Sequence, residues 1–348
     1  MEETADWRLT LSDSITTLKQ LGDHLSIDVA ELAPVIERYP MRIPRAFFGL
    51  IRKENDPIWR QVVPNAAELG GTLKDGDPLN ESGQSPLPGL IHRYPDRVIL
   101  AVSNHCAAYC RFCMRKRHAG REPSLSMESF DRCMAYIRNC SDISEVILSG
   151  GDPLMLADNK LGQILKALKK ITHVKILRTH TRMPGTLPAR ITANLVELLK
   201  NHQPLFVMVH FNHPRELSAS AVKALAHLAD AGIPLGSQTV LLKGVNDSPD
   251  VMSALMRKLV QNRVKPYYLH HPDLIRGTDH LRCSISGGMN IMDKLRGHLS
   301  GLCVPQYMLD LPGGGGKVPL LPGYIVRQKN DILTVKNYCG DTYHYPLS

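Results

Sequence analysis

The sequence has few aromatic residues, no apolar run long enough to cross a membrane, and no close pair of cysteines outside one short stretch. Phe, Trp and Tyr make up only 5% of the 348 residues and no RNA-binding motif is present, so base stacking on a nucleic acid is poorly provided for. The acidic first residues lack the apolar core of a signal peptide, which predicts a cytoplasmic protein without a membrane partner. Cysteines in that reducing compartment are metal ligands or buried thiols.

The net charge of +9 indicates an anionic partner. The basic run at residues 111–118 is the obvious patch for a nucleic acid, but the phosphate and carboxylate groups of small molecules also require Arg and Lys. We therefore expect a small anionic molecule, with a nucleic acid or a protein-bound substrate as the less favoured alternatives. Five scattered cysteines are expected to be packing residues: Cys133, Cys140, Cys283, Cys303 and Cys339.

Three cysteines follow the apolar run 98–102 in a C-x3-C-x2-C spacing: Cys106, Cys110 and Cys113. Three thiolates are one fewer than a closed zinc site or a fully ligated cubane cluster requires, so a cluster held here keeps one iron free for a small ligand. In a zinc site the fourth ligand would come from His105, His118 or a distant cysteine. The open iron favours catalysis over a structural site.

This spacing on the loop after a first strand resembles that of the radical S-adenosylmethionine (SAM) enzymes, as does the aromatic Phe112 before the third cysteine. The resemblance implies a [4Fe-4S] cluster held by the three cysteines. The amino and carboxylate groups of SAM would chelate the fourth iron, and reductive cleavage of SAM would give a 5'-deoxyadenosyl radical. An electron donor such as flavodoxin or ferredoxin is then required.

Apolar residues between 12 and 37 recur at helical intervals, which predicts a helical N-terminal extension, and residues 64–90 read as an irregular connection. Beyond residue 94, short Val-, Ile- and Leu-rich runs alternate with helical patterns. The predicted strands are 97–102, 145–148, 174–178, 205–211, 235–242 and 264–269; the predicted helices are 126–138, 161–170, 193–201, 218–231, 250–261 and 288–299, the last leading into 304–309.

Such strand-helix units require a parallel sheet, whose active sites gather at the carboxyl ends of the strands. The resemblance to radical SAM enzymes favours an α/β fold with a partial (β/α)6 TIM-like barrel at residues 91–309. Residues 1–90 would form the helical extension and irregular connection, and residues 310–348 a short Gly-rich C-terminal segment that carries a cofactor-binding lysine.

Polar residues at the ends of the predicted strands are candidates for binding SAM. Gly150, Gly151 and Asp152 match the GGDP element that contacts the methionine amino group of SAM in radical SAM enzymes, and paired glycines permit close backbone approach. His210 and Gln238 lie at the ends of later strands and could face the same cofactor. A ligand-free turn and ordinary strand-end polar residues are the structural alternatives.

The second decisive stretch, residues 309–319, has four glycines before Lys317. The glycines predict a flexible loop that can wrap a phosphate, and a partly desolvated lysine amine can form a Schiff base. A GxxxxGKS phosphate loop is excluded because Val318 replaces Ser or Thr and no helical pattern follows. A plain flexible loop is the alternative.

The cysteine motif and this Gly-rich stretch together resemble the lysine 2,3-aminomutase family, with similar patterns from about residue 56 onward. The resemblance implies that Lys317 binds pyridoxal 5'-phosphate (PLP), with Arg93 and Arg97 close to that cofactor. It also implies that L-lysine is the substrate and that it isomerises to β-lysine.

By the same resemblance, Arg115 binds the α-carboxylate of the substrate, and Asp273 and Asp310 hold its ε-ammonium. Two carboxylates around one cation are favourable where water is scarce. The sequence lacks the C-terminal extension of longer aminomutases, which carries extra cysteines for zinc and helps subunits assemble. Its length matches a branch that makes β-lysine for elongation factor P, although that branch often lacks the full PGGGG run and the second Asp. The use of the product, homo-oligomer formation and action on another amino acid or on nucleic acid stay open.

Overall fold

The computed structural model describes residues 6–25, 29–71, 73, 76–121, 124–329 and 331–347. The α-helices in these ranges are α1 (Trp7–Ser12), α2 (Leu18–Leu25), α3 (Ala33–Arg38), α4 (Arg45–Phe48), α5 (Trp59–Val62), α6 (Met127–Asn139), α7 (Asp158–Lys169), α8 (Met183–Thr186), α9 (Ala193–Lys200), α10 (Ala219–Asp230), α11 (Pro249–Gln261) and α12 (Ile285–Leu295). The strands are β1 (Leu90–Tyr94), β2 (Arg97–Ser103), β3 (Glu145–Gly150), β4 (Ile176–Thr181), β5 (Leu205–His210), β6 (Leu235–Val240), β7 (Lys265–His270), β8 (Gln306–Leu311), β9 (Gly316–Pro319), β10 (Ile325–Lys329), β11 (Ile332–Lys336) and β12 (Thr342–Pro346). Short 3-10 turns are η1 (Ala30–Leu32), η2 (Ala66–Glu68), η3 (Ser82–Gln84), η4 (Pro153–Met155), η5 (Pro188–Arg190), η6 (Pro214–Glu216), η7 (Asp279–Leu281), η8 (Gly301–Cys303) and η9 (Pro312–Gly314).

Strands β1 to β9 form one sheet whose spatial order follows the chain. Neighbours from β2 to β8 are parallel, while β1 and β9 add an antiparallel strand at each edge. The sheet curls into a nearly closed barrel, in which one contact links the edge strands: the backbone N–H of Lys317 on β9 donates a 2.9 Å hydrogen bond to the hydroxyl of Tyr94 at the end of β1. The expected α/β radical SAM barrel is therefore confirmed, with β8 as a further parallel strand.

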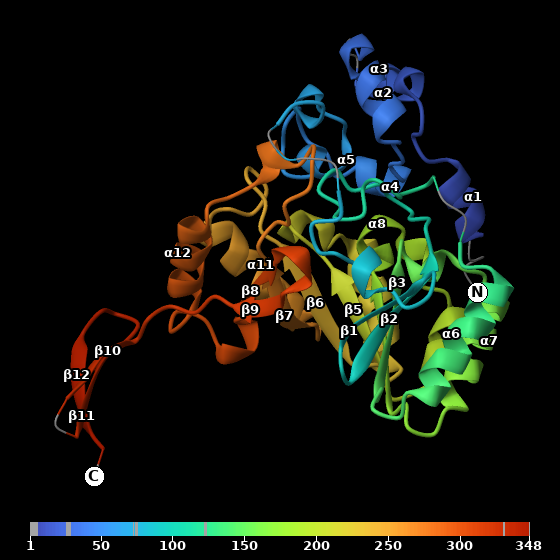
Figure 1. The fold of residues 1–348 in the computed structure, drawn as a ribbon. Coiled ribbons are helices and arrows are strands. Elements are labelled where there is room, and N and C mark those ends of the chain that lie inside the picture. Colours follow the sequence, from blue (N-terminus) through green and yellow to red (C-terminus); the bar gives the residue numbers. More distant parts are fainter. Residues whose placement is uncertain are drawn as a thin grey trace.

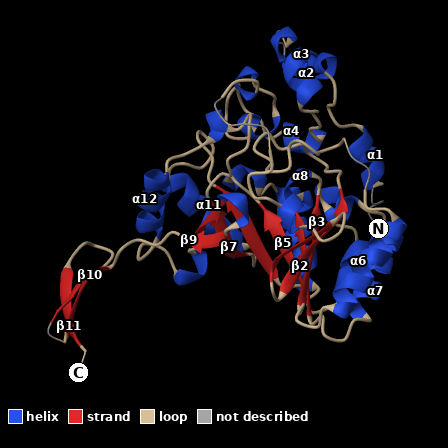
Figure 2. Ribbon diagram, in the orientation of Figure 1, coloured by secondary structure: helices blue, strands red, loops and turns tan. Residues whose placement is uncertain are grey.

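The helices pack outside the strands, as Figures 1 and 2 show. Strand β3 is buried at almost every position, as expected for a parallel strand covered on both faces. Helix α7 buries Leu161, Ile164, Leu165 and Leu168, whose spacing places them on one face toward the sheet. Each predicted helix between residues 126 and 261 is present with end shifts of up to three residues, and the last one begins at Ile285 rather than 288.

A second apolar cluster joins the N-terminal segment to the barrel. Ile15, Leu21, Phe47 and Trp59 are buried together and pack with Ala108, which lies inside the cysteine loop. The N-terminal extension is helical, as predicted, but it is broken into the short helices α1 to α5. The segment covers the cavity end of the barrel and reaches the cysteine loop.

The C-terminal part contains strands that the sequence analysis did not predict. Residues after Pro319 form a separate antiparallel sheet, β10-β11-β12, which stands away from the barrel in Figure 1. Its strands contain β-branched and aromatic residues, such as Ile325, Val326, Val335, Tyr343 and Tyr345, which favour strands and which the focus on the glycines overlooked. Cys339 lies in the turn between β11 and β12 and is exposed, so the expectation that it is a packing residue is wrong. Cys133 and Cys303 are buried, and Cys140 and Cys283 pack against the main core.

Among the described residues, no helix combines the length and the apolar character that a membrane crossing requires.

Candidate active site

The carboxyl ends of the parallel strands surround a cavity of about 480 Å³, a volume typical of small-molecule sites. Gly150 is the one predicted site residue that does not line it, although its carbonyl accepts a 3.2 Å hydrogen bond from Arg115 at the rim. The predicted residues that line the cavity are Arg93, Arg97, Cys106, Cys110, Cys113, Arg115, Gly151, Asp152, His210, Gln238, Asp273, Asp310 and Lys317. The fold thus gathers residues spread over more than 220 positions of sequence.

Cys106, Cys110 and Cys113 face one common space in this cavity. Burial, together with the neighbouring Cys110, raises the pKa of the Cys113 thiol to about 11, and burial also raises the pKa of Cys106 well above its usual value. A bound metal reverses this preference because a coordinating thiol is deprotonated. No three His, Cys, Asp or Glu side chains in the described ranges converge on a single ion. The three thiols line the same cavity, and thiolates are the ligands that iron-sulfur clusters use.

A buried ion cluster holds the cysteine loop in place. The carboxylate of Glu68, on η2, accepts hydrogen bonds from the guanidinium of Arg111 and a 2.5 Å bond from the ammonium of Lys116, and all three side chains are at most 4% exposed. Removing one partner from such a cluster leaves an uncompensated buried charge. The connection 64–90, which sequence patterns left irregular, therefore anchors the loop that carries the cluster ligands.

The turn after β3 depends on two glycines. Gly150 has φ +114°, and a Cβ on Gly151 would collide with the backbone of His105 in the cysteine loop. The carboxylate of Asp152 accepts three hydrogen bonds from other protein groups. The donors are the backbone N–H of Leu154 (3.0 Å), the hydroxyl of Thr181 (2.9 Å) and the backbone N–H of Arg182 (2.8 Å). Burial raises the pKa of Asp152. Glycines here bring the β3 turn against the cysteine loop, while Asp152 ties that turn to the end of β4.

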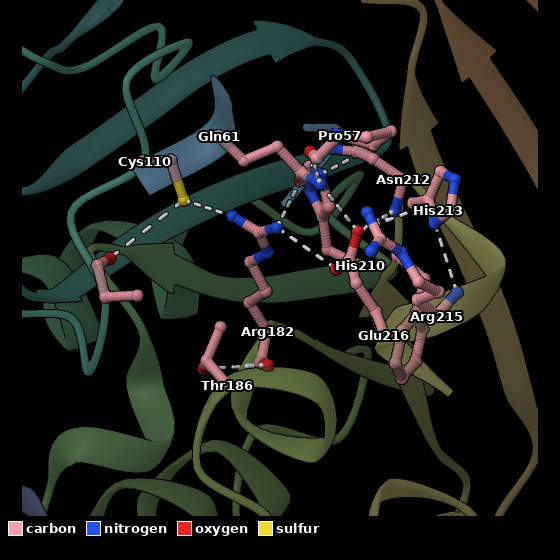
Figure 3. A network of polar contacts seen from close by, with 12 residues as sticks. Pro57, Gln61, Cys110, Arg182, Thr186, His210, Asn212, His213, Arg215 and Glu216 are labelled. Carbon is pink, nitrogen blue, oxygen red and sulfur yellow. Dashed lines mark hydrogen bonds and ion pairs between the residues drawn. The ribbon is translucent and has the colours of Figure 1, made fainter. Parts of the chain in front are cut away.

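Arg182 is a cavity residue that the sequence did not single out. Its guanidinium lies between Cys110 and the side chains of Gln61 and Glu216, as Figure 3 shows. Burial disfavours its charge, but Cys110 and Glu216 outweigh that effect and raise its pKa, so the side chain is cationic. A fixed positive charge therefore touches one of the three thiols.

His210 and Gln238 lie toward the carboxyl ends of β5 and β6 and face the cavity. The imidazole of His210 stacks on Phe112 at 5.5 Å, and its Nε2 lies 2.9 Å from Asn212 Oδ1. Burial, followed by the nearby Arg182, lowers the pKa of His210 well below its usual value. The ring is neutral and oriented, as a binding residue for an uncharged part of a cofactor requires.

Lys317 lies on strand β9, so its expected placement on a flexible loop is wrong. The glycines make a tight turn, η9, with φ +69° at Gly313 and +88° at Gly314. That turn folds β9 back along β8 and places Lys317 directly opposite Asp310. The Lys317 ammonium donates to the Asp310 carboxylate. A backbone held by strand pairing positions the amine more firmly than a loop would.

The two predicted acidic residues, Asp273 and Asp310, face the same cavity, but their pKa values are shifted in opposite directions. Burial, followed by the charge of Asp310, raises the pKa of Asp273 to about 7. Burial also acts to raise the pKa of Asp310, but hydrogen bonding from His270 and the charge of Lys317 outweigh it and lower that pKa to about 2. Lys317 is therefore the one cation paired with Asp310. A second cation beside Asp273 would favour ionisation of its carboxyl group.

Arg93 and Arg97 flank the lysine turn. Arg93 donates to Gln84 Oε1 (2.6 Å) and to the carbonyl of Leu79 (2.8 Å), and its Nη1 lies 3.6 Å from Asp310 Oδ1. Gln84 in turn donates to the carbonyl of Gly314, at 2.9 Å. Arg97 lies over the ring of Tyr94 at 3.9 Å. Both guanidinium groups line the cavity beside Lys317, where an anionic cofactor group would need them.

Arg115 is already paired with a carboxylate. Its Nη2 and Nε donate to the two oxygens of Glu81 at 2.6 and 3.0 Å, in the bidentate geometry that Arg forms with carboxylates. Glu81 precedes η3 in a segment without periodic pattern and lines the same cavity. Glu81 therefore pairs with the same Arg115 guanidinium that, by the family resemblance, would bind the substrate carboxylate.

Sequence reasoning missed several cavity residues for two reasons. His180 lies near the end of β4 and Arg182 follows that strand, which was predicted to end at residue 178. The rule that places sites at strand ends would have found both with the correct boundary. His270 likewise lies one residue beyond the predicted end of β7. Glu81 carries no sequence signal, because only its tertiary contact with Arg115 reveals it.

The chain is 43% identical to an L-lysine 2,3-aminomutase of Clostridium subterminale over 99% of its own length and 85% of that protein. The chain belongs to the lysine 2,3-aminomutase family. Residues 292–347 match the family described as lysine-2,3-aminomutase, and residues 100–255 match the radical SAM superfamily. A lysine 2,3-aminomutase of Methanococcus maripaludis is 44% identical, over 96% of this chain and 80% of that protein.

The family includes more than one substrate. A glutamate 2,3-aminomutase of Clostridioides difficile is 38% identical over 97% of this chain and 82% of that protein. Radical SAM aminomutase chemistry, with an iron-sulfur cluster and SAM, therefore follows from the family, and the three cavity cysteines suit it. The choice of amino acid has to be argued from the side chains.

Proposed function

We propose that this protein converts L-lysine to β-lysine, moving the α-amino group to the β-carbon, with a [4Fe-4S] cluster, SAM and PLP as cofactors. Substrate and product are isomers, so the net reaction neither gains nor loses atoms or electrons. The observation that carries the proposal is the pair Asp273 and Asp310 beside Lys317, both facing the cavity.

The acidic pair selects a cationic side chain. Asp310 is 5% exposed and is neutralised here by Lys317, whereas burial and the charge of Asp310 push Asp273 toward its protonated form. An ammonium placed between the two carboxylates offsets that repulsion and lets both ionise. A glutamate side chain would add a third anion to the same space, which disfavours it by several kcal/mol where water is excluded.

Arg115 is proposed to bind the α-carboxylate, since its bidentate contact with Glu81 has the geometry that a substrate carboxylate would adopt. Lysine binding then requires the exchange of one carboxylate for another at the same guanidinium. The exchange leaves Arg115 paired with a carboxylate, whereas Glu81, whose side chain is 12% exposed, gives up its arginine partner. Glu81 thereby acts as a stand-in for the substrate carboxylate.

Lys317 is proposed to hold PLP, with Arg93 and Arg97 neutralising its phosphate. All three side chains line one side of the cavity, and the strand pairing of β9 with β8 fixes the lysine backbone. Two buried atoms in this region, His180 Nε2 and Asp310 Oδ1, have no hydrogen-bond partner among the described residues. Burial, then the charges around it, lowers the pKa of His180 to about 3, so it presents a neutral ring to the cavity.

Cys106, Cys110 and Cys113 are proposed as the cluster ligands. The residues proposed to contact SAM are Gly150, Gly151, Asp152, His210 and Gln238. When bound, the cluster and SAM supply the radical that abstracts the β-hydrogen, and PLP holds the migrating nitrogen. The protein positions these groups and keeps water from them. A one-electron donor such as flavodoxin or ferredoxin would reduce the cluster; assembly into a homo-oligomer, and use of β-lysine free or for elongation factor P, are separate questions.

The test is anaerobic incubation of the reconstituted protein with SAM, PLP, a reductant and lysine, glutamate or arginine in separate reactions. We expect β-lysine from lysine and no β-glutamate. Formation of β-glutamate without β-lysine would leave the radical chemistry intact and refute the choice of lysine. Reactions without PLP should give no product, since Lys317 and its neighbours would then hold no cofactor.

A further inference from the structure

Among the described residues, Arg182 is the guanidinium that donates a hydrogen bond to a cysteine sulfur of the proposed cluster site. It follows β4 directly, and its Nη1 lies 2.8 Å from Cys110 Sγ. Two other guanidinium groups near the cysteines donate to other atoms: Arg42 to the backbone carbonyl of Cys106 at 3.2 Å, and Arg115 to Glu81, Ser149 and Gly150. The contact to sulfur is therefore specific to one arginine and one thiol.

Neighbouring groups hold Arg182 rigidly. Its Nη2 donates to Gln61 Oε1 at 2.5 Å and to Glu216 Oε2 at 3.1 Å, and Glu216 is fully buried. The guanidinium lies between two rings, 5.1 Å from the centroid of Phe47 and 5.2 Å from that of Phe112. Figure 3 shows the resulting line of contacts from Cys110 through Arg182 to Glu216. An arginine fixed at this many points keeps its N–H directed at sulfur without a further loss of entropy.

Glu216 is itself fixed. Its Oε1 accepts from the backbone N–H groups of Asn212 (3.0 Å) and His213 (2.9 Å) and from Gln61 Nε2 (3.0 Å). These neutral donors hold the carboxylate in place, and Arg182 contributes the positive charge. Cys110 therefore has a cation, Arg182, in direct contact and an anion, Glu216, behind that cation. The two charges have opposite effects on the sulfur, and Arg182 is the nearer.

We propose that Arg182 is a positioning residue that fixes Cys110 and raises the reduction potential of the cluster bound there, with Glu216 limiting the effect. Reduction adds one electron from the external donor to the cluster, which makes its ligand sulfurs more electron-rich. An N–H donor and a positive charge stabilise that reduced form more than the oxidised form. Arg182 exchanges no proton or electron. The inference concerns cluster reduction and does not depend on which amino acid is the substrate.

The test is a redox titration of the anaerobically reconstituted protein without SAM, followed by the electron paramagnetic resonance signal of the reduced cluster, with iron and sulfide measured for each variant. We expect Arg182→Met to lower the equilibrium constant for one-electron reduction at least tenfold, equivalent to about 59 mV. Arg182→Lys keeps the charge but loses the fork of donors, so its potential should fall between those of Arg182→Met and the wild type.

Glu216→Gln supplies the opposite perturbation. It removes the counter-charge while leaving Arg182 and Cys110 in place, so the potential should rise. Arg263→Gln, which breaks an exposed pair with Asp230, is the matched control for loss of an arginine charge and should leave the potential unchanged. An unchanged potential in Arg182→Met at full iron content would overturn the proposal. If Arg182→Met failed to bind iron, a reduction potential in Glu216→Gln no higher than that of the wild type would overturn the proposal equally. The aminomutase assay is not part of either readout, so failure of the lysine assignment would leave this result unaffected.

Discussion

Asp273→Asn should weaken lysine turnover without disturbing the rest of the site. The side chain of Asp273 lines the cavity, and burial with the charge of Asp310 raises its pKa to about 7. Asp310 also binds Lys317, so a change there would affect the cofactor lysine as well as the substrate. Asp273 is the better probe, because its substitution by an amide of the same size removes only one carboxylate charge from the proposed ammonium site.

The magnitude follows from the loss of one partner of a desolvated charge pair. Such a loss costs about 2 to 4 kcal/mol, and each 1.36 kcal/mol corresponds to roughly a factor of ten. We expect kcat/KM for lysine to fall by roughly thirty- to a thousand-fold. Norleucine, which has the same carbon chain without the amine, should be processed no worse by the variant than by the wild type.

The pH profile gives a second readout of the same residue. Burial, followed by the charges of Asp310 and Glu81, raises the pKa of Asp273, whereas Lys317 and Arg93 lower it, and the result is a value of about 7. Binding of an ammonium needs the ionised carboxylate, so kcat/KM of the wild type should rise as pH increases through about 7. That rise should be missing in Asp273→Asn. A variant that kept both the efficiency and the pH profile of the wild type for lysine would refute the ammonium site.

Three further predictions concern the other groups of the site. Alanine at any one of the three cluster cysteines should abolish iron binding, because three ligands leave none to spare, whereas Cys339→Ser, at an exposed turn, should keep full iron content by colorimetric assay. Lys317→Ala should lose borohydride trapping of PLP yet retain the cluster and SAM cleavage; undiminished trapping would point to another lysine, with Lys243 the first to examine. Glu81→Gln should lower the KM for lysine by up to about tenfold at similar kcat, because a competing carboxylate leaves Arg115; a raised KM would show that Glu81 instead orients Arg115 for the substrate.

Local chemistry explains what the sequence could predict. The cysteine spacing and Lys317 after its glycines are contiguous patterns whose chemistry is readable without tertiary contacts. Val-, Ile- and Leu-rich runs likewise marked the parallel strands, because both faces of such strands are buried. Asp273 and Asp310 required the family resemblance, since each alone reads as a turn or cap residue.

Tertiary contacts explain what it could not. Glu81 is an ordinary loop carboxylate until the fold places it on Arg115, 34 residues later in the chain. Arg182 was hidden by a strand end misplaced by three residues, and Glu68 by a connection without periodicity. Strand β9 was missed because glycines favour turns, whereas here the turn only reverses the chain and pairing with β8 then fixes Lys317.

The central claim is that the acidic pair makes this protein a lysine enzyme, and a competition experiment tests it most directly. Equal concentrations of L-lysine and L-glutamate are given together to the reconstituted protein under anaerobic, reducing conditions, and both β-amino acids are measured by mass spectrometry. The claim predicts β-lysine as the dominant product, with no more than traces of β-glutamate. Equal amounts of the two products, or an excess of β-glutamate, would contradict it.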